Sequence, residues 1–543
     1  MKLSSSFNSQ AQTKMKLSNY LFVFALLFSF LLVTSAHTHE DFLQCLTLHS
    51  EKDKPISNII YTPSNSSYSS ALNSYVRNTR FSTPSTPKPR VIVTPLGVSQ
   101  IQETLYCAQK HRIQVRVRSG GHDYEGLSFV SPEPFVILDM INLRNISIDV
   151  ENNTAWVQSG ATLGELYYWI ANKSRTLGFP AGVCQTIGVG GHFSGGGYGT
   201  LLRKYGLAAD NVLDAHLIDV KGRFLNRKSM GEDLFWAIRG GGGASFGVIV
   251  SWKIKLVPVP ANVTVFTVRK GLEQNATKIL HRWQYVAPNI DRDLFIRVIL
   301  TGSGSVQYGN RSVHASFNSI YLGGKDKLLP LMQKSFPELG LVSEDCTEMS
   351  WIQSILYFTG FQNGQSLEVL LNRSLTVNSY KAKSDYVRQP IPEDALEGIW
   401  PSFFEEEAQS SVIILNPYGG RMSEISESAT PFPHRAGVIG KIQYLVYWSE
   451  EGTAATKKHV RWMRRLYTYM APYVSNSPRE AYINYRDLDI GKNNKGRRTS
   501  LRQASIWGTK YFKNNFKRLV FVKTVFDPTN FFRNEQSIPP LSF

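Results

Sequence analysis

The sequence predicts an α+β fold in which one mixed part is interrupted by a second, antiparallel part. Short apolar strands alternate with amphipathic helices up to about residue 255. Pro258 and Pro260 then mark a change in composition, and longer strands follow to about residue 475, which predicts an antiparallel sheet with helices on one side. The last segment is expected to complete the first part. The expected regions are 1–36, 37–255, 256–475 and 476–543.

Residues 1–36 have the layout of a secretory signal peptide. The run from Leu21 to Val33 is apolar apart from Ser29, lysines precede it, and Thr34-Ser35-Ala36 follows it. A run of this length is too short to span a bilayer comfortably. We expect cleavage after Ala36 and no membrane contact afterwards, with an uncleaved anchor as the alternative.

The chain is basic, with a formal net charge of +18 that falls to +15 without the three lysines of the leader. Lysine and arginine are spread along the sequence, and together with a secretory route this disfavours a nucleic-acid partner. An acidic cell wall or carboxylate-bearing substrates fit better. Asn-x-Ser/Thr sequons stand at Asn65, Asn145, Asn152, Asn172, Asn262, Asn275, Asn310 and Asn372.

The cysteines are Cys45, Cys107, Cys184 and Cys346. In an oxidising compartment two of them are expected to pair, and the residues alone leave three connectivities open. Cys346 precedes an apolar stretch and is expected to be a buried bystander thiol. No metal site is expected.

The first part is read as strands and helices in alternation. No strand at its start is followed by a Gly-x-Gly-x-x-Gly that opens a helix, so it is not a dinucleotide-binding βαβ unit. The expected elements are strands at 91–93, 135–138 and 154–157, a helix opened by the capping box Ser99-x-x-Gln102, and a helix opened by Thr162-x-x-Glu165.

A further strand leads into the first glycine motif. Ile113, Val115 and Val117 alternate with polar residues and run into the segment 119–123, Ser-Gly-Gly-His-Asp. Such a turn can direct backbone amides at a diphosphate and an imidazole at the same ligand. A histidine in an ordinary loop has the same kind of sequence around it, so the motif alone does not distinguish a ligand site from such a loop.

The second glycine motif, 178–199, is denser and carries Cys184 at its mouth. Glycine lets the backbone approach phosphate or a flat ring closely. Large apolar residues are interleaved with the glycines, which indicates a packed, shaped segment rather than a flexible linker.

The second part is expected to contain strands at 263–268, 294–300 and 442–448 and a helix at 457–469. These lengths exceed those of the first part, in keeping with an antiparallel sheet.

Five segments together resemble a known family. They are 118–123, 184–199, 236–243, 484–489 and 530–539. These motifs and their order along the chain are similar to those of the plant berberine bridge enzyme-like flavoproteins. Within that family the similarity is greatest to the cannabinoid acid synthases. The resemblance implies a two-part FAD-binding domain of the vanillyl-alcohol-oxidase type with an inserted substrate domain. It also implies a monomer in the apoplast, a vacuole or a vesicle, and a Cys45–Cys107 disulfide.

By the same resemblance, FAD is held by two covalent bonds, from His122 to a ring methyl carbon and from Cys184 to a benzenoid carbon. The residues expected to bind the cofactor are Ser119, Gly120, Gly121, His122, Cys184, Gly188, Gly190, Gly191, His192, Gly195 and Tyr485.

A flavin that takes a hydride needs a base for the accompanying proton. Tyrosine, with an ordinary pKa near 10, is a poor base unless a cation favours the phenolate. The resemblance makes Tyr198 the base, assisted by Lys441 of a Lys-Ile-Gln-Tyr strand, and offers Tyr485 as a second candidate. The alternatives are a packing role for Tyr198 and a solvated strand lysine at 441.

Tyr124, Arg297, Asn416 and Gln443 are expected around the substrate. The cannabinoid synthases have His, Tyr and Glu where this chain has Ile299, Asn416 and Lys441, so the same substrate contacts are not expected. Arg297 faces the same side of its strand as Ile299 and can pair with a phenolate or carboxylate. Its alternative is a surface arginine on an edge strand.

Ile187 stands three residues after Cys184, where the family has an oxygen gatekeeper. In the family, valine at this position is associated with rapid use of oxygen by the flavin. A bulkier residue is expected to hinder the access of oxygen to the flavin.

These residues favour a secreted bicovalent FAD oxidoreductase that transfers hydride from a phenolic or prenylated small molecule to flavin N5, with possible oxidative cyclisation. The alternatives are a redox-neutral cyclase or Diels-Alderase of prenylated phenolics, a monolignol or carbohydrate alcohol dehydrogenase, and a storage or allergen-like protein without turnover. Ile187 and the missing His-Tyr-Glu set favour the cyclase, whereas Tyr198, Lys441, Tyr485 and both anchors favour hydride transfer.

Overall fold

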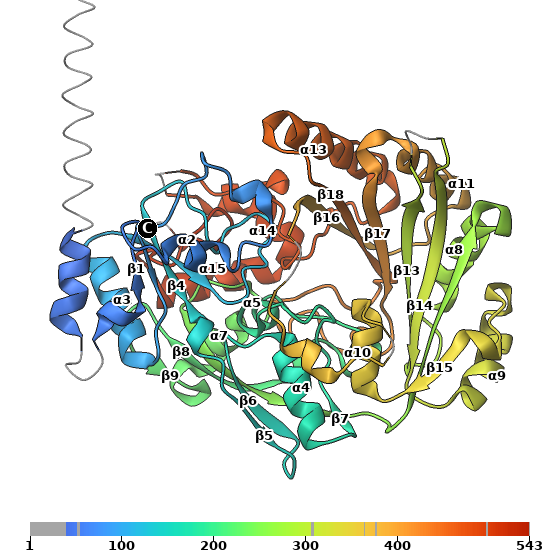
Figure 1. The fold of residues 1–543 in the computed structure, drawn as a ribbon, viewed down its shortest axis with the longest axis horizontal. Coiled ribbons are helices and arrows are strands. Elements are labelled where there is room, and N and C mark those ends of the chain that lie inside the picture. The colour runs from blue at the N-terminus through green and yellow to red at the C-terminus, as the bar shows by residue number, and fades with distance from the viewer. Residues whose placement is uncertain are drawn as a thin grey trace, which may run out of the picture.

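A computed structural model describes residues 40–50, 55–305, 309–362, 364–374, 377–495 and 498–541. The expected signal peptide lies outside these residues. Figure 1 shows two lobes, one built on small sheets from the first half of the chain and the other on a large sheet of long strands. No helix in the described ranges is long and apolar enough to cross a membrane.

Two small sheets form the first lobe. In one, β3 and β2 run parallel to β4 while β1 pairs antiparallel with β2. The other is antiparallel, in the order β5-β6-β10-β8-β9. The strands are β1 Ile60–Tyr61, β2 Val91–Val93, β3 Gln114–Arg118, β4 Phe135–Asp139, β5 Ile146–Asp149, β6 Thr154–Gln158, β8 Val212–Ile218, β9 Phe224–Leu225 and β10 Val248–Lys255, with β7 Leu177–Gly178 and β11 Val257–Pro258 as a separate pair.

The second lobe contains a seven-stranded antiparallel sheet in the order β15-β12-β14-β13-β17-β18-β16. Its strands are β12 Val263–Gly271, β13 Leu294–Ser303, β14 Ser312–Tyr321, β15 Cys346–Met349, β16 Ser379–Val387, β17 Ser410–Pro417 and β18 Gly440–Trp448. Because β13 lies between β14 and β17, Arg297 is not on an edge strand. Cys346 starts the edge strand β15 and is only half-buried, so the expectation of a buried thiol is wrong.

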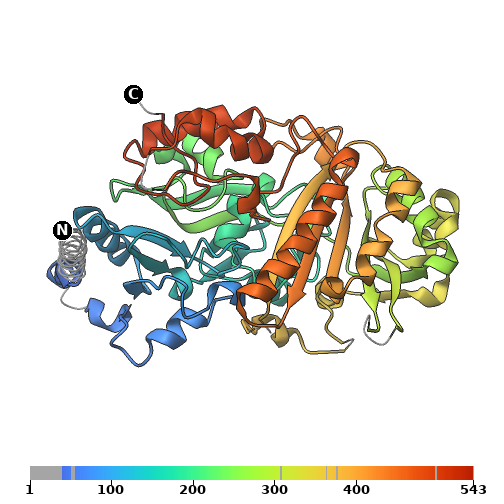
Figure 2. The ribbon, with the colours of Figure 1, turned by 90° about the horizontal axis from the view of Figure 1, so that it is seen from above.

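Helices cover the outer face of this sheet. The long helix α13 packs on β16 and β18, and α8 packs on β14 and α11 (Figure 2). Apolar residues of the strands and of α8, α9, α11 and α13 form one core there. These helices are α8 Ala276–Val286, α9 Lys325–Ser335, α11 Glu393–Glu397 and α13 Gly452–Tyr469.

The remaining helices belong mainly to the first lobe. The two C-terminal helices, α14 and α15, pack on each other, and α15 contacts α7, which returns the end of the chain to the first lobe (Figure 1). The helices are α2 Tyr68–Asn73, α3 Val98–Lys110, α4 Leu163–Lys173, α5 Val189–Ser194, α6 Leu202–Tyr205, α7 Arg227–Ile238, α10 Trp351–Thr359, α12 Arg421–Glu424, α14 Leu501–Phe512 and α15 Asn515–Phe526.

The two expected capping boxes have different outcomes. At α4 the box is confirmed, because the Thr162 hydroxyl accepts from the Glu165 N–H at 3.3 Å and the Glu165 carboxylate accepts from the Thr162 N–H at 2.8 Å. The box at Ser99 is wrong. Helix α3 begins at Val98 with Gly97 as its N-cap, so Ser99 already lies within the first turn.

The first cysteine pair is present as expected. Cys45, in the helical segment 40–49, is bonded to Cys107 on α3 with 5.8 Å between their Cα atoms. Cys184 and Cys346 are free thiols. The bond ties the helical segment 40–49 to α3.

Candidate active site

A cavity of about 540 Å³ lies where the two lobes and the C-terminal segment meet. Nearly all the residues expected to bind cofactor or substrate line it. They are Ser119, Gly120, Gly121, His122, Tyr124, Cys184, Ile187, Gly188, Gly190, Gly191, His192, Tyr198, Arg297, Asn416, Gln443 and Tyr485. Gly195 and Lys441 are not on its wall.

Glycine brings the two sequence motifs into contact. A Cβ atom at Gly120 would lie 2.3 Å from the backbone nitrogen of Gly188, so neither loop tolerates a side chain at this crossing. At Gly191 nothing lies within 4 Å of the Cβ position, which leaves bare backbone at the cavity. Gly195 instead packs against Asn484, whose Oδ1 would be 1.9 Å from its Cβ. Packing against Asn484, rather than contact with the cofactor, therefore explains why residue 195 is a glycine.

The two expected anchors meet at one hydroxyl. His122 Nε2 lies 2.9 Å from Thr186 Oγ1, and Cys184 Sγ lies 3.7 Å from the same oxygen. Burial, reinforced by the charge of Arg77, lowers the pKa of His122 to about 3, so its imidazole is neutral. Sequence reasoning missed Thr186, although its place two residues after Cys184 could have marked it.

His192 is also held as a neutral imidazole. Its Nε2 accepts a hydrogen bond from the Gly182 N–H at 3.0 Å, and burial together with the charge of Lys441 lowers its pKa to about 3. The ring therefore presents a fixed polar group to the cavity.

Three tyrosines cluster at the wall of the cavity. The hydroxyls of Tyr198 and Tyr485 are hydrogen-bonded to each other, and Tyr485 stacks on Tyr124 with ring centroids 5.4 Å apart and an interplanar angle of 9°. Asn416 Nδ2 lies 3.4 Å from the Tyr198 hydroxyl. Burial raises the pKa of Tyr198 to about 12, while the hydrogen bond from Tyr485, the charge of Arg297 and the hydrogen bond from Asn416 limit the rise.

Lys441 is buried against the ring of Tyr198 and is not on the cavity wall. Its Nζ is 3.0 Å from the centroid of the Tyr198 ring and 4.2 Å from that of Tyr482, and it has no hydrogen-bond partner among the described residues. Burial lowers its pKa well below the usual value. The alternative of a solvated strand lysine is therefore wrong, and the amine meets the ring face of Tyr198 rather than its hydroxyl.

Arg297 holds a fixed position at the cavity. Its Nε donates to Asn318 Oδ1 at 2.8 Å and one terminal nitrogen donates to the Phe358 carbonyl at 3.3 Å. Burial lowers its pKa to about 10, against the opposing influence of Tyr198 and Tyr485. On β18, which β17 separates from β13, Gln443 Nε2 donates to the Tyr124 hydroxyl at 2.7 Å.

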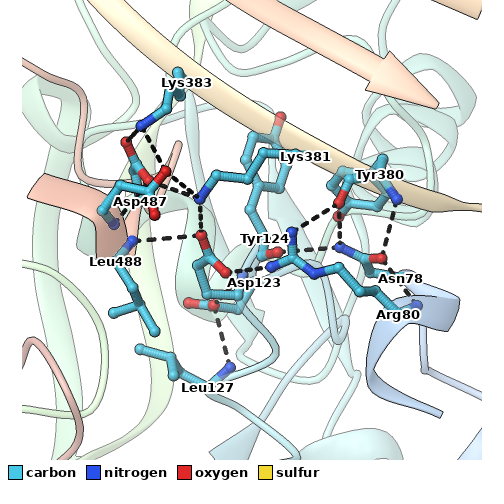
Figure 3. A network of polar contacts seen from close by, with 12 residues as sticks. Asn78, Arg80, Asp123, Tyr124, Leu127, Tyr380, Lys381, Lys383, Asp487 and Leu488 are labelled. Carbon is cyan, nitrogen blue, oxygen red and sulfur yellow. Dashed lines mark hydrogen bonds and ion pairs between the residues drawn. The ribbon is translucent and has the colours of Figure 1, made fainter. Parts of the chain in front are cut away.

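Buried charges join the three parts of the chain beside this site, as Figure 3 shows. Lys381 Nζ pairs with Glu125 and lies 2.7 Å from Asp487, and Lys383 Nζ lies 2.6 Å from Asp487. Arg80 also pairs with Glu125. Glu125 follows the His122 loop, and Asp487 follows Tyr485, so the two lysines of β16 fix both loops. Sequence reasoning missed them because alternate lysines on a strand usually indicate a solvated face, yet they are only 3% and 2% exposed.

The cavity fits FAD. Two loops of bare backbone can lie against phosphate and a flat ring, and two nucleophiles face the same space. Ser159 Oγ and Arg77 Nε are buried without a partner among the described residues, and both side chains line the cavity, as expected where a polar ligand is bound.

Comparisons with known proteins agree with this chemistry. Residues 89–227 match the family model described as FAD binding domain, and residues 481–539 match the one described as berberine and berberine like. Tetrahydroberberine oxidase of Berberis wilsoniae is 53% identical over 97% of this chain and 99% of its own length. Monolignol oxidoreductase AtBBE-like 13 of Arabidopsis thaliana is 51% identical over 94% and 95%.

Among solved structures, Phl p 4, a grass pollen allergen with glucose dehydrogenase activity, has a TM-score of 0.87 at 46% identity and covers 93% of this chain and 100% of its own. Fold, cavity and relatives define an FAD-dependent oxidoreductase with a vanillyl-alcohol-oxidase type fold that acts on a small molecule. The chain belongs to the berberine bridge enzyme-like family.

Proposed function

We propose that this chain is a secreted oxidoreductase that carries FAD on His122 and Cys184 and oxidises a phenolic or prenylated plant metabolite. The observation that supports this most directly is the shared position of the two nucleophiles. Both line the cavity that also contains the Tyr198–Tyr485 pair, and both contact the buried Thr186. The non-catalytic alternative is set aside, because the relatives are enzymes.

When bound, FAD supplies the acceptor for a hydride. The protein supplies the base, and Tyr198 is placed to take the proton at its hydroxyl oxygen. Tyr485 and Asn416 donate toward that oxygen, and Arg297 adds a positive charge, so the three groups favour the phenolate against the cost of burial. Tyr485 remains the second candidate base, and its stack on Tyr124 fixes its ring.

The lining of the cavity favours a flat, largely apolar substrate. Apolar side chains from the large sheet share the wall with aromatic rings, which can stack on a phenol. These residues are Phe295, Ile414, Leu445, Tyr124, Tyr380 and Tyr447. Arg297 gives an ionised phenol or a carboxylate a fixed partner.

Ile187 supports a dehydrogenase rather than a fast oxidase. It lies on the cavity wall, and its N–H donates to the Cys184 carbonyl at 3.3 Å, so it is held next to one anchor. Wild-type Phl p 4 is described as a glucose dehydrogenase, whereas an isoleucine-to-valine variant of it is described as a glucose oxidase. We propose the same gating for Ile187.

Exposure of the sequons supports passage through the secretory pathway. All eight asparagines are exposed, and the Cys45–Cys107 bond is formed. A monomer is proposed for the mature protein.

The second candidate function is redox-neutral cyclisation of a prenylated phenol, with FAD as a scaffold. Ile187, Ile299 and Asn416 support it. Rapid anaerobic mixing of the yellow protein with prenylated phenols, monolignols and sugars separates the two. Bleaching of the flavin absorbance together with product formation supports hydride transfer. Product formation with the flavin still oxidised contradicts it and supports the cyclase.

A further inference from the structure

We propose that Thr186 is the positioning residue that prepares both His122 and Cys184 for covalent attachment to FAD. This inference rests on the bicovalent attachment proposed above and adds a residue to which no role has been given. Three observations carry it: the burial of Thr186, its two contacts, and the hydrogen-bonding capacity of a hydroxyl.

Thr186 is completely buried, and its Oγ1 is 2.9 Å from His122 Nε2 and 3.7 Å from Cys184 Sγ. A hydroxyl has one hydrogen to donate and two lone pairs that accept. When Oγ1 accepts from the Nε2–H of His122, its own hydrogen is free to point at the sulfur of Cys184. One side chain therefore orients both nucleophiles.

The first contact fixes the orientation of the His122 ring. When Nε2 carries the hydrogen and donates it to Oγ1, the lone pair is on Nδ1, and that nitrogen is the nucleophile. The neutral ring follows from its burial and from Arg77, which together keep the pKa of His122 at about 3. In this arrangement Thr186 occupies Nε2 and leaves Nδ1 free to attack.

The second contact orients the thiol. Oγ1 of Thr186 lies 3.7 Å from Cys184 Sγ, which is within reach of a hydrogen bond to sulfur. This contact restrains the position of Sγ at the cavity wall, where Cys184 lies.

Each new bond replaces one hydrogen on the flavin carbon and one hydrogen on the nucleophile. At His122, a C–H bond and an N–H bond are lost and one C–N bond is formed. At Cys184, a C–H bond and an S–H bond are lost and one C–S bond is formed. Each step releases two electrons and two protons. Bound FAD would supply the acceptor for these electrons, and dioxygen would be the terminal oxidant, giving one hydrogen peroxide per bond.

The test compares Thr186→Val, which keeps the shape but loses the hydroxyl, with Thr186→Ser, which keeps the hydroxyl. Thr200→Val is the matched control, because Thr200 is also a buried threonine, lines the same cavity as the two anchors, and is joined to neither of them by a hydrogen bond. Acid-precipitable flavin and the masses of flavin-bearing peptides are measured in three backgrounds: unaltered, Cys184→Ala and His122→Ala. Total bound flavin and the circular dichroism spectrum report folding separately.

We expect Thr186→Val to lower acid-stable flavin about tenfold in the Cys184→Ala background, as for the loss of one hydrogen bond, and about threefold in the His122→Ala background. Thr186→Ser and Thr200→Val should stay within about twofold of their parents. A folded, flavin-binding Thr186→Val variant with unchanged attachment at both residues overturns the role of Thr186 alone. Unaltered protein that releases all its flavin in acid overturns both this inference and the bicovalent function.

Discussion

Lys441 Nζ lies 3.0 Å from the centroid of the Tyr198 ring. The hydroxyl of the same ring is hydrogen-bonded to Tyr485. Tyr198 is therefore influenced from two directions, by an amine on its ring face and by donors at its oxygen. Burial lowers the pKa of Lys441, and an ammonium on the ring face stabilises a phenolate more than a phenol, so a proton on Lys441 and a phenolate at Tyr198 favour each other.

Replacing Lys441 by Met keeps the length of the side chain and removes the amine that can carry a charge. We expect flavin reduction at pH 7 to slow about tenfold, in line with the 1–2 kcal/mol of a buried cation–π contact. Tyr198→Phe removes the base and should slow it about 100-fold or more. In the Tyr198→Phe background the lysine change should have little further effect. A tenfold loss in that background as well would show that Lys441 acts elsewhere.

The rate of flavin reduction should also rise with pH. Since the pKa of Tyr198 is about 12, only a small fraction is phenolate at neutral pH, and that fraction grows tenfold per pH unit below the pKa. Stopped-flow measurements of kred/Kd from pH 6 to 10 would check this. A flat profile would exclude a tyrosine of this pKa as the base.

Ile187→Val should open the path of dioxygen to the flavin. The change removes one methylene from a side chain on the cavity wall beside Cys184. We expect reoxidation of the reduced enzyme by oxygen to accelerate at least about tenfold, while anaerobic reduction by substrate changes less than about twofold. Ile187→Leu conserves the volume and serves as the control. Equal oxygen rates in all three proteins would place the gate at another residue.

Lys381→Met should destabilise the fold, because it leaves the carboxylates of Glu125 and Asp487 buried with less compensation. Breaking one partner of a buried pair costs about 3–5 kcal/mol. The double variant Lys381→Met with Glu125→Gln should recover part of this loss, since one of the two carboxylates is then neutral. Urea unfolding of the three proteins measures the difference. A single variant as stable as its parent would show that the network does not hold the loops together.

Prediction from the sequence was accurate where a local pattern carries the signal. The strands at 91–93 and 135–138, the box at Thr162 and the two glycine motifs are all of this kind. It failed where the surroundings of a side chain depend on residues from a distant part of the chain. Alternate lysines at 381 and 383 look solvated until Asp487, about a hundred residues away, is brought beside them. For the same reason Lys441 could be linked to Tyr198 by resemblance, but its approach to the ring face could not be foreseen.

Glu480 provides a stability prediction at a second contact between the lobes. Its carboxylate accepts from Arg388 Nε at 2.8 Å and lies 2.6 Å from His434 Nδ1. Burial opposes its ionisation, but the hydrogen bond and charge of His434 and the charge of Arg388 outweigh burial and lower the pKa of Glu480 to about 2. A carboxyl with a folded-state pKa below its unfolded value near 4.5 stabilises the fold above pH 4.5, and this contribution is lost as the pH falls toward 2.

Glu480→Gln should therefore lower the free energy of unfolding at pH 7 by up to about 3 kcal/mol, and the difference from the parent should shrink between pH 4.5 and 2. Urea unfolding at several pH values measures it. Glu338→Gln is the control, because Glu338 pairs with Arg282 at 3.1 Å but both side chains are nearly half exposed, and such pairs contribute less than about 1 kcal/mol. A Glu480 difference that stays constant down to pH 2 would show that the lost contact is steric, since only the ionised carboxylate gives the effect its dependence on pH.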